Sequence, residues 1–455
     1  MIKQGLKRIM RTAALLSPLL LPLGACDSLF GEEGMSSWFK GAKAPPLPGK
    51  RISVLLHERV LAPDPNLANA EILLPPPSVN QEWPQPGGYA NHAMHHILVN
   101  DVLSQAWGVG VGKAANSGNL FIGSPIVSAG RVFAMDVNTM VTSVDAKTGA
   151  KYWQVKLTPD EEDDGHIGGG IAYEGGRIFV TAGFAQVIAL HAGNGSLLWK
   201  KNLSSPLRSA PTVRGGRVFV LTVDNKLHVL AAHTGDTVWS HEGVAESASM
   251  LGGGSPAVDG GVVVAPYSSG ELVALMVENG RLLWSESLAM ARRTEEISTM
   301  SHIRGRPVID RGRVFAMSHG GVLVSIDLRS GRRIWTKEIG GLESPWVAGD
   351  YIFVLTNDSE IAALSREDGR IHWVQGLPRF EDEKDKKKPV VWSGPVLVSD
   401  RLLIAGSHGV VMAVSPYTGS IMGKVEIPDG VSVSPVVAGG SVYFLSNDAE
   451  LVAYR

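Results

Sequence analysis

The sequence predicts an all-β fold, an eight-bladed β-propeller of four-stranded antiparallel blades. Two observations predict it: a Gly followed four residues later by Trp recurs along the chain, and β-branched and aromatic runs separate the copies. The pairs are Gly149/Trp153, Gly195/Trp199, Gly235/Trp239, Gly280/Trp284, Gly331/Trp335 and Gly369/Trp373, and a seventh copy has Gly419 but Gly423 in place of Trp. Their spacing of roughly 45 residues is the period of a four-stranded blade.

The predicted first strands mark eight repeat units. Seven begin at a proline, which a strand entrance tolerates because its missing N–H breaks no ladder bond. These prolines are Pro125, Pro211, Pro256, Pro307, Pro345, Pro395 and Pro435. The second unit begins near Ile171.

The last unit is incomplete, because the chain stops at Arg455 before any Gly turn or Trp-bearing strand. An unpaired blade edge would recruit other strands. Residues 97–107, which end in Leu103–Trp107, look like a terminal strand without its beginning. We therefore expect a propeller over residues 97–455, closed by an N-terminal strand that joins the C-terminal blade.

The repeated Gly and Trp have a structural explanation. An indole ring buries about 150–250 Å2, enough to fill the wedge between adjacent twisted sheets. The Gly supplies a positive-φ turn that aims the strand. The sequence therefore predicts blade-docking roles for Trp153, Trp199, Trp239, Trp284, Trp335 and Trp373.

The N-terminus has the pattern of a secretory signal. Lys3, Lys7, Arg8 and Arg11 precede a short apolar stretch over residues 12–23, which two prolines interrupt. The run Leu23–Cys26 resembles the lipobox of bacterial lipoproteins, which implies that Cys26 is lipidated. We expect a signal peptide over residues 1–25, and a lipid anchor with a Pro/Gly-rich tether over residues 26–96.

Composition narrows the function classes. The chain has 455 residues, with 42 Lys and Arg against 44 Asp and Glu, a balance that argues against a nucleic-acid surface. Only 19% of residues are charged and the mean hydropathy is +0.08, which indicates a large core. Cys26 is the single cysteine, so intramolecular disulfides and Cys-rich zinc sites are excluded.

The segment Ser143–Trp153 resembles the tryptophan-docking motif of quinoprotein-type eight-bladed propellers, and residues 189–199, 325–335 and 363–373 are looser copies. Together with the lipobox and the tether, the chain resembles the BamB family of lipoproteins in the bacterial β-barrel assembly machinery. That resemblance implies a non-enzymatic scaffold without cofactors, lipid-anchored at the periplasmic face of the outer membrane. Its implied partners are the periplasmic domains of the barrel-inserting subunit BamA, and unfolded outer-membrane proteins. Asp27 resembles an inner-membrane retention signal, so inner-membrane anchoring stays open.

The resemblance also implies a partner surface. The family uses a Leu-Arg pair in the loop before a Ser-Ala-Pro strand entrance, which Leu207 and Arg208 match here. Two blades further on the family uses acidic residues, whereas this chain has His302 and Arg304 before Pro307 and no acid. We expect partner binding through Leu207, Arg208, His302 and Arg304. A merely solvated Arg208 is an equally good interpretation of the sequence.

The alternative function is a periplasmic quinone-dependent dehydrogenase, since the same propeller carries such enzymes. Their resemblance to one another includes an axial calcium site and commonly a vicinal disulfide, which a single cysteine cannot form. The one dense acidic run, Glu161–Asp164, is more typical of a solvated patch than of a calcium site. The sequence thus predicts no catalytic, cofactor-binding or metal-binding residue.

Three remaining segments receive structural interpretations. His92, His95 and His96 are expected to be surface histidines, because no Cys or carboxylate stands near them in the sequence. The Gly-rich run Gly108–Lys113 is expected to be a flexible crossover, and residues 381–388 a mobile charged loop.

Overall fold

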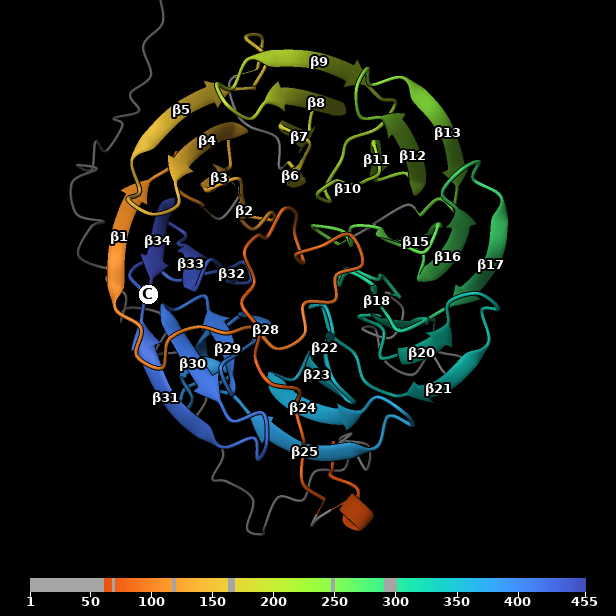
Figure 1. The fold of residues 1–455 in the computed structure, drawn as a ribbon. Coiled ribbons are helices and arrows are strands. Elements are labelled where there is room, and N and C mark those ends of the chain that lie inside the picture. The colour runs from red at the N-terminus through yellow and green to blue at the C-terminus, as the bar shows by residue number, and fades with distance from the viewer. Residues whose placement is uncertain (1–60, 68–69, 117–119, 163–167, 247–249, 290–300) are drawn as a thin grey trace, which may run out of the picture. The chain divides into compact units, whose positions relative to one another are not determined.

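The computed structural model describes residues 61–67, 70–116, 120–162, 168–246, 250–289 and 301–455. The predicted signal peptide, Cys26, Asp27 and the first part of the tether lie outside the described residues. Leu61–Arg455 is one compact unit, in which eight four-stranded antiparallel sheets surround a central axis (Figure 1). The predicted all-β eight-bladed propeller is confirmed.

Each blade runs from the axis outward in chain order. The innermost strands are β2 (Ile126–Ser128), β6 (Gly170–Glu174), β10 (Thr212–Arg214), β14 (Ala257–Asp259), β18 (Val308–Asp310), β22 (Trp346–Ala348), β28 (Trp392–Val398) and β32 (Val436–Ala438). The second strands are β3 (Arg131–Met135), β7 (Arg177–Ala182), β11 (Arg217–Leu221), β15 (Val262–Pro266), β19 (Arg313–Met317), β23 (Tyr351–Leu355), β29 (Arg401–Gly406) and β33 (Ser441–Leu445). We number the blades 1 to 8 in this order.

The outer half of each blade follows the same order. The third strands are β4 (Met140–Asp145), β8 (Gln186–His191), β12 (Lys226–Ala231), β16 (Glu271–Met276), β20 (Leu323–Asp327), β24 (Glu360–Ser365), β30 (Val410–Val414) and β34 (Glu450–Tyr454). The outermost strands are β5 (Lys151–Lys156), β9 (Leu197–Asn202), β13 (Thr237–Glu242), β17 (Leu282–Ser287), β21 (Arg333–Lys337), β25 (Ile371–Gly376), β31 (Ile421–Glu426) and, in blade 8, β1 (Gln105–Gly110). A short 3-10 helix, η2 (Pro65–Leu67), precedes the propeller.

The N-terminal strand closes the ring as predicted. β1 pairs antiparallel with β34, with Trp107 opposite Ala453 and Gly110 opposite Glu450. Blade 8 therefore contains strands from both ends of the propeller sequence, which leaves no open edge on β34. The expectation of a flexible crossover over Gly108–Lys113 was wrong in its first half, because Gly108 and Gly110 are part of this strand.

Each docking tryptophan reaches the next blade. The Trp153 indole N–H donates to Ala192 O at 3.0 Å, and a Cβ added to Gly195 would lie 2.7 Å from Trp153 Cε3. The Gly thus adopts the positive-φ turn and, because it has no side chain, leaves room for the indole of the preceding blade. The same bond joins Trp199 to Ala232 O, Trp239 to Val277 O, Trp284 to Leu328 O, Trp335 to Arg366 O and Trp373 to Pro416 O.

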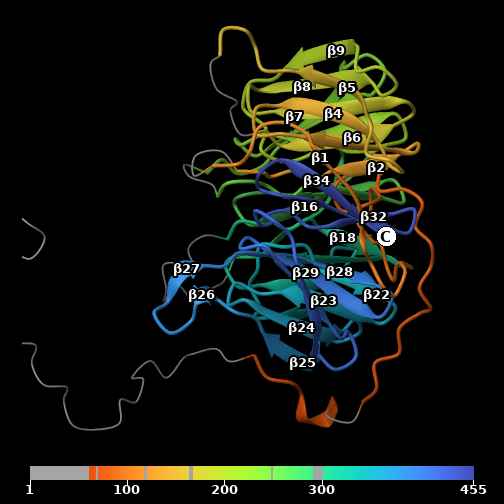
Figure 2. The ribbon, with the colours of Figure 1, turned by 90° about the vertical axis from the view of Figure 1, so that its left-hand side faces the viewer.

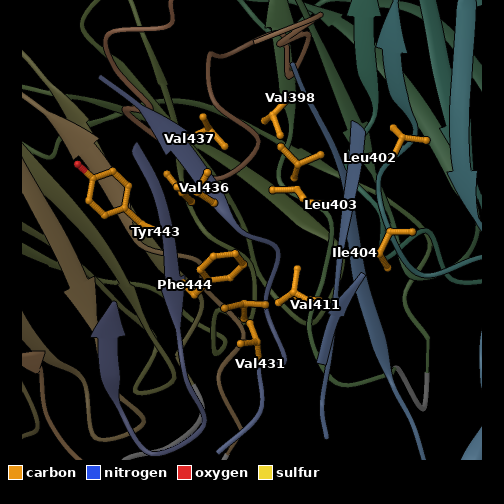
Figure 3. Close-up of a cluster of buried hydrophobic side chains, with 14 of the residues drawn as sticks. Val398, Leu402, Leu403, Ile404, Val411, Val431, Val436, Val437, Tyr443 and Phe444 are labelled. Carbon is orange, nitrogen blue, oxygen red and sulfur yellow. The ribbon is translucent and has the colours of Figure 1, made fainter. Parts of the chain in front are cut away.

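The boundary between blades 7 and 8 differs from the other seven, because at the blade 8/1 boundary Trp107 of β1 supplies the ring: a Cβ added to Gly149 would lie 2.8 Å from Trp107 Cδ2. Its Trp position is occupied by Gly423, and no atom lies within 4 Å of a Cβ built there. All six residues of β31 are exposed. Nearer the axis the two blades still share a core, where Leu403 and Val411 of blade 7 lie next to Val436 and Phe444 of blade 8 (Figure 3). This boundary keeps its inner packing but lacks the outer indole.

Residues 78–99, which we call the collar, circle the axis on one face of the propeller (Figures 1 and 2). The sequence assigned most of them to the tether, and the structure packs them against the innermost strands. His92 and His96 are consequently buried, at 6% and 2% exposure, so the expectation of surface histidines was wrong for both. His95 is exposed. The predicted domain boundary at residue 97 stays a prediction.

The opposite face carries the loops that lead from each outermost strand to the next innermost strand, and we call it the mouth face. The segment expected to be a mobile charged loop lies there as a hairpin of β26 (Phe380–Asp382) and β27 (Lys387–Pro389) (Figure 2). Lys388 and Glu381 form an ion pair at 2.9 Å across it. Among the described residues, no helix has the length and apolar character needed to cross a bilayer.

Candidate functional site

Two of the predicted partner-binding residues lie on one pocket of the mouth face. Arg208 comes from the loop before β10 of blade 3, and His302 from the loop before β18 of blade 5. The hollow between them has a volume of about 40 Å3. It is also lined by Ser209, Asn225, Met250, Gly252, Gly253, Gly254 and Ser268. The fold therefore joins residues that are 94 positions apart in the sequence.

Arg208 is the most available charged group of this pocket. Its side chain is partly buried, and its guanidinium forms no hydrogen bond or ion pair with any described residue. The neighbouring Ser209 is 3% exposed, and its hydroxyl also has no partner within the described part of the chain. An Arg with a free planar fork can bind a partner with geometric specificity.

Leu207 does not have the role that the sequence predicted. Its side chain is 0% exposed and packs with Val213, Val218 and Leu230 of blade 3. Its backbone also bridges to Thr222. An apolar side chain with no exposed surface cannot contact a partner in this conformation, so we correct its role: Leu207 fixes the loop that presents Arg208.

His302 is buried and neutral at the pocket wall. Burial, with smaller contributions from Arg304 and His319, lowers the pKa of His302 to about 4. The backbone N–H of Met250 donates to Nδ1 at 3.3 Å. Because Nδ1 accepts, the ring proton of the neutral imidazole is on Nε2. His302 thus offers a hydrogen-bond donor without charge.

Arg304 has a carboxylate partner that sequence reasoning missed. Arg304 Nη1 lies 3.9 Å from Glu343 Oε1, and Glu343 also accepts from Ser434 Oγ at 3.2 Å. Glu343 stands in the loop before β22, two residues before Pro345. The acid absent from the loop before Pro307 is therefore supplied by the next loop around the axis. A comparison of all the strand entrances would have found it.

Arg306 is a further charged side chain near this region. It occupies the position before Pro307, where most blades have Ser, Ala or Gly. Burial lowers its pKa, and its Nε has no partner among the described residues. His92 of the collar lies beside it: burial and the Arg306 charge lower the pKa of His92 to about 3. Arg306 therefore links the mouth face to the collar.

The remaining predicted sites are placed as follows. The six docking tryptophans lie between blades and have a structural role. Cys26 lies outside the described residues. Of the acidic run Glu161–Asp164, the last two residues are also outside the described ranges. Within the described part of the chain, no group of three or more His, Cys, Asp or Glu side chains is placed to hold a metal ion.

A family model and several curated relatives match this chain to one family. The model of the family described as "Outer membrane protein assembly factor BamB" matches residues 137–375. Proteins of that name from Moranella endobia and Escherichia coli are 24% and 26% identical to this chain, over 76% and 75% of its length. The alignments cover 89% and 86% of those relatives.

Solved structures show the same fold. BamB from Moraxella catarrhalis has a TM-score of 0.66 and 21% identity, covering 78% of this chain and all of that one. A europium-containing methanol dehydrogenase has a TM-score of 0.62 and 15% identity, covering 80% of this chain and 89% of the enzyme, a likeness of fold alone. The family match extends over more than half of the sequence, from blade 1 to blade 6. The chain belongs to the BamB family of outer membrane protein assembly factors.

Proposed function

We propose that this chain is a non-enzymatic lipoprotein scaffold of the β-barrel assembly machinery. It is anchored through Cys26 at the periplasmic face of the outer membrane and binds the periplasmic domains of BamA. In that position it aids the assembly and insertion of outer-membrane proteins. Family membership supports the assembly role, and the observation that carries the binding role is Arg208 beside the mouth-face pocket, whose guanidinium has no partner among the described residues.

The mouth face suits recognition better than the opposite face does. Its loops present Arg208 on blade 3, His302 and Arg304 on blade 5 and Glu343 on blade 6, held by a rigid ring. Leu207 and Thr222 pin the loop that carries Arg208, so little ordering cost is expected when a partner binds. We therefore assign BamA binding to Arg208 and Arg304, with His302 as a neutral donor between them.

The test is charge reversal at Arg208 with a matched control. Arg208→Glu is expected to reduce co-purification of BamA at least tenfold, at an unchanged melting temperature, because the free guanidinium contributes to binding and not to folding. Arg214→Glu, at the collar-side end of strand β10, which follows the Arg208 loop, is the control and is expected to retain BamA. Retention of BamA by both variants would remove Arg208 from the interface.

The anchor and the competing function have their own tests. Cys26→Ser is expected to move the protein from the membrane to the soluble periplasmic fraction, and density-gradient separation of the wild-type membranes distinguishes the two membranes.

For a quinone-dependent dehydrogenase, pyrroloquinoline quinone and Ca2+ are added to the purified protein. Saturable dye reduction with an alcohol substrate would overturn the non-enzymatic proposal.

A further inference from the structure

We propose that the collar is a lock, a second closure of the ring near the axis. We call the place where its two ends join the clasp, and we propose that the clasp lies over the one blade boundary without a docking indole. The perimeter closure by β1 joins strands within blade 8. It does nothing for the boundary between blades 7 and 8, where Gly423 replaces the tryptophan. Because a ring opens first at its least stable boundary, contacts of the collar that hold blades 7 and 8 together would stabilise the whole propeller.

The first observation is that the collar bonds to every blade. At each blade, at least one hydrogen bond of 2.7–2.9 Å joins the collar to the innermost strand or its flanking turn. In chain order they join Asn80 to Val437 and Gly439 of blade 8, Trp83 to Val127 of blade 1, Pro84 to Tyr173 of blade 2, Gln85 to Val213 of blade 3, Ala90 to Val258 of blade 4, Asn91 to Ile309 of blade 5, His95 to Trp346 of blade 6 and Ile97 to Ser399 of blade 7. One pass of the collar therefore visits the eight blades in ring order.

The second observation is that the collar closes on itself. Ser78 N donates to His96 O at 3.0 Å, and Leu98 N donates to Ser78 O at 2.8 Å. These bonds join the start of the loop to its end, so the collar is a closed circle within the circle of blades.

The third observation is where that circle closes. Its start bonds to blade 8 through Asn80, whose Nδ2 donates to Val437 O at 2.8 Å. Its end bonds to blade 7 through Val99, whose N–H donates to Ser399 Oγ at 2.8 Å, while Ser399 Oγ donates back to Val99 O at 2.7 Å. The clasp therefore spans the blade 7/8 boundary, on the axis side of the missing indole.

Buried side chains hold the collar in place between these ends. Trp83 is 3% exposed and stacks on Trp346 of blade 6, with ring centroids 6.3 Å apart. Gln85, also 3% exposed, satisfies the N–H of Val213 on blade 3. Separating blades 7 and 8 would pull the two ends of the collar apart and break these bonds in turn. Opening the boundary is thereby coupled to the whole ring.

The test measures amide hydrogen exchange at the clasp in the full chain. Asn80→Ala removes the side-chain bond to blade 8 and is expected to speed exchange at least tenfold at the amides of Ser399 and Gly439, which donate to the two ends of the collar, Ile97 O and Asn80 O. Asn91→Ala is the matched control, because the Asn91 side chain bonds only within the collar, to Ala93 N. The lock is rejected where Asn80→Ala leaves these amides unchanged, or where both variants speed them equally.

A second experiment cuts the chain only after it has folded. A protease site placed at Val102, which is 83% exposed between the collar and β1, permits a cut after folding. The collar fragment is expected to stay bound through gel filtration and to leave only when the ring unfolds in denaturant. Release of the fragment from a ring that stays monomeric, with unchanged exchange in blades 7 and 8, would overturn the proposal.

Discussion

The two faces of the propeller are built from the opposite ends of the same strands, yet they treat polar groups in opposite ways. On the collar face, backbone N–H groups of the inner strands are paired by the collar, as Val258 is by Ala90 O and Ile309 by Asn91 O. On the mouth face, the Arg208 guanidinium and the Ser209 hydroxyl have no partner among the described residues. On the collar face the chain itself pairs backbone groups of the inner strands, although Trp83 Nε1 and His92 Nε2 lack partners in the described part of the chain. On the mouth face the Arg208 guanidinium stays available to a partner outside the chain.

That difference separates stability from recognition. Satisfied buried groups stabilise a fold, since a buried donor without a partner costs about 1–3 kcal/mol. Groups left unpaired at a rigid surface are typical of binding sites, where local rules of folding are broken for function. Substitutions in the collar should therefore change the free energy of unfolding, and substitution of Arg208 at the mouth should change partner binding alone.

The largest expected effect is that of Trp83→Ala in the collar. It removes a buried indole and its stack on Trp346, so we expect the free energy of unfolding to fall by about 3–5 kcal/mol. Urea denaturation followed by circular dichroism measures the change. Tyr152→Ala, at a half-exposed aromatic on β5, is the control and should cost well under half as much. A loss below about 1 kcal/mol for Trp83→Ala would mean that the collar contributes little to stability.

The next effect is a loss of stability in acid that both faces share. Burial lowers the pKa of His92 in the collar to about 3 and that of His302 at the mouth to about 4, from 6.5. Below pH 6.5 the unfolded chain takes up protons at these two rings and the folded chain does not, so stability falls with pH. Above pH 6.5 these two rings take no stability from the folded chain. At pH 5 the free energy of unfolding is lower by up to about 2 kcal/mol per histidine.

His92→Asn tests the collar half of this effect and His302→Asn the mouth half. Each should flatten the dependence of the urea midpoint on pH between 7.5 and 5. His95→Asn is matched to His92→Asn, because both residues have positive φ, which Asn tolerates. The His95 variant therefore controls for the placing of Asn at a positive-φ position of the collar. Equal slopes in all three variants would show that neither buried ring is responsible.

The sequence predicted the blades but not the collar, and the reason is physical. A blade repeats a side-chain pattern, and the Gly149/Trp153 spacing recurs because each copy solves the same packing problem between sheets. The collar joins the blades mainly through its own backbone, as in Pro84 O and Ala90 O, and backbone groups have no residue signature. Its Pro and Gly content is equally typical of an extended tether. Only burial of His92 and Gln85 reveals the difference.

The candidate site was predictable to a similar extent. A loop motif located Arg208, but Leu207 beside it belongs to the core, because adjacent residues on a pinned loop point to different environments. Glu343 was missed because it pairs with Arg304 across two loops, and single-loop patterns do not report such pairs. Sequence reasoning therefore finds a side chain's position in a repeat more reliably than its partner across the ring.

The smallest expected effect sharpens the comparison most. Arg208→Ala should change the free energy of unfolding by less than about 0.5 kcal/mol, because no described residue loses a partner. The same substitution should still abolish much of the BamA binding proposed for the mouth. Arg214→Ala, at the collar-side end of the strand that follows the Arg208 loop, should be neutral in both measurements. A large loss of stability at Arg208 would mean that its guanidinium serves the fold, and the division of labour between the two faces would then fail at its central residue.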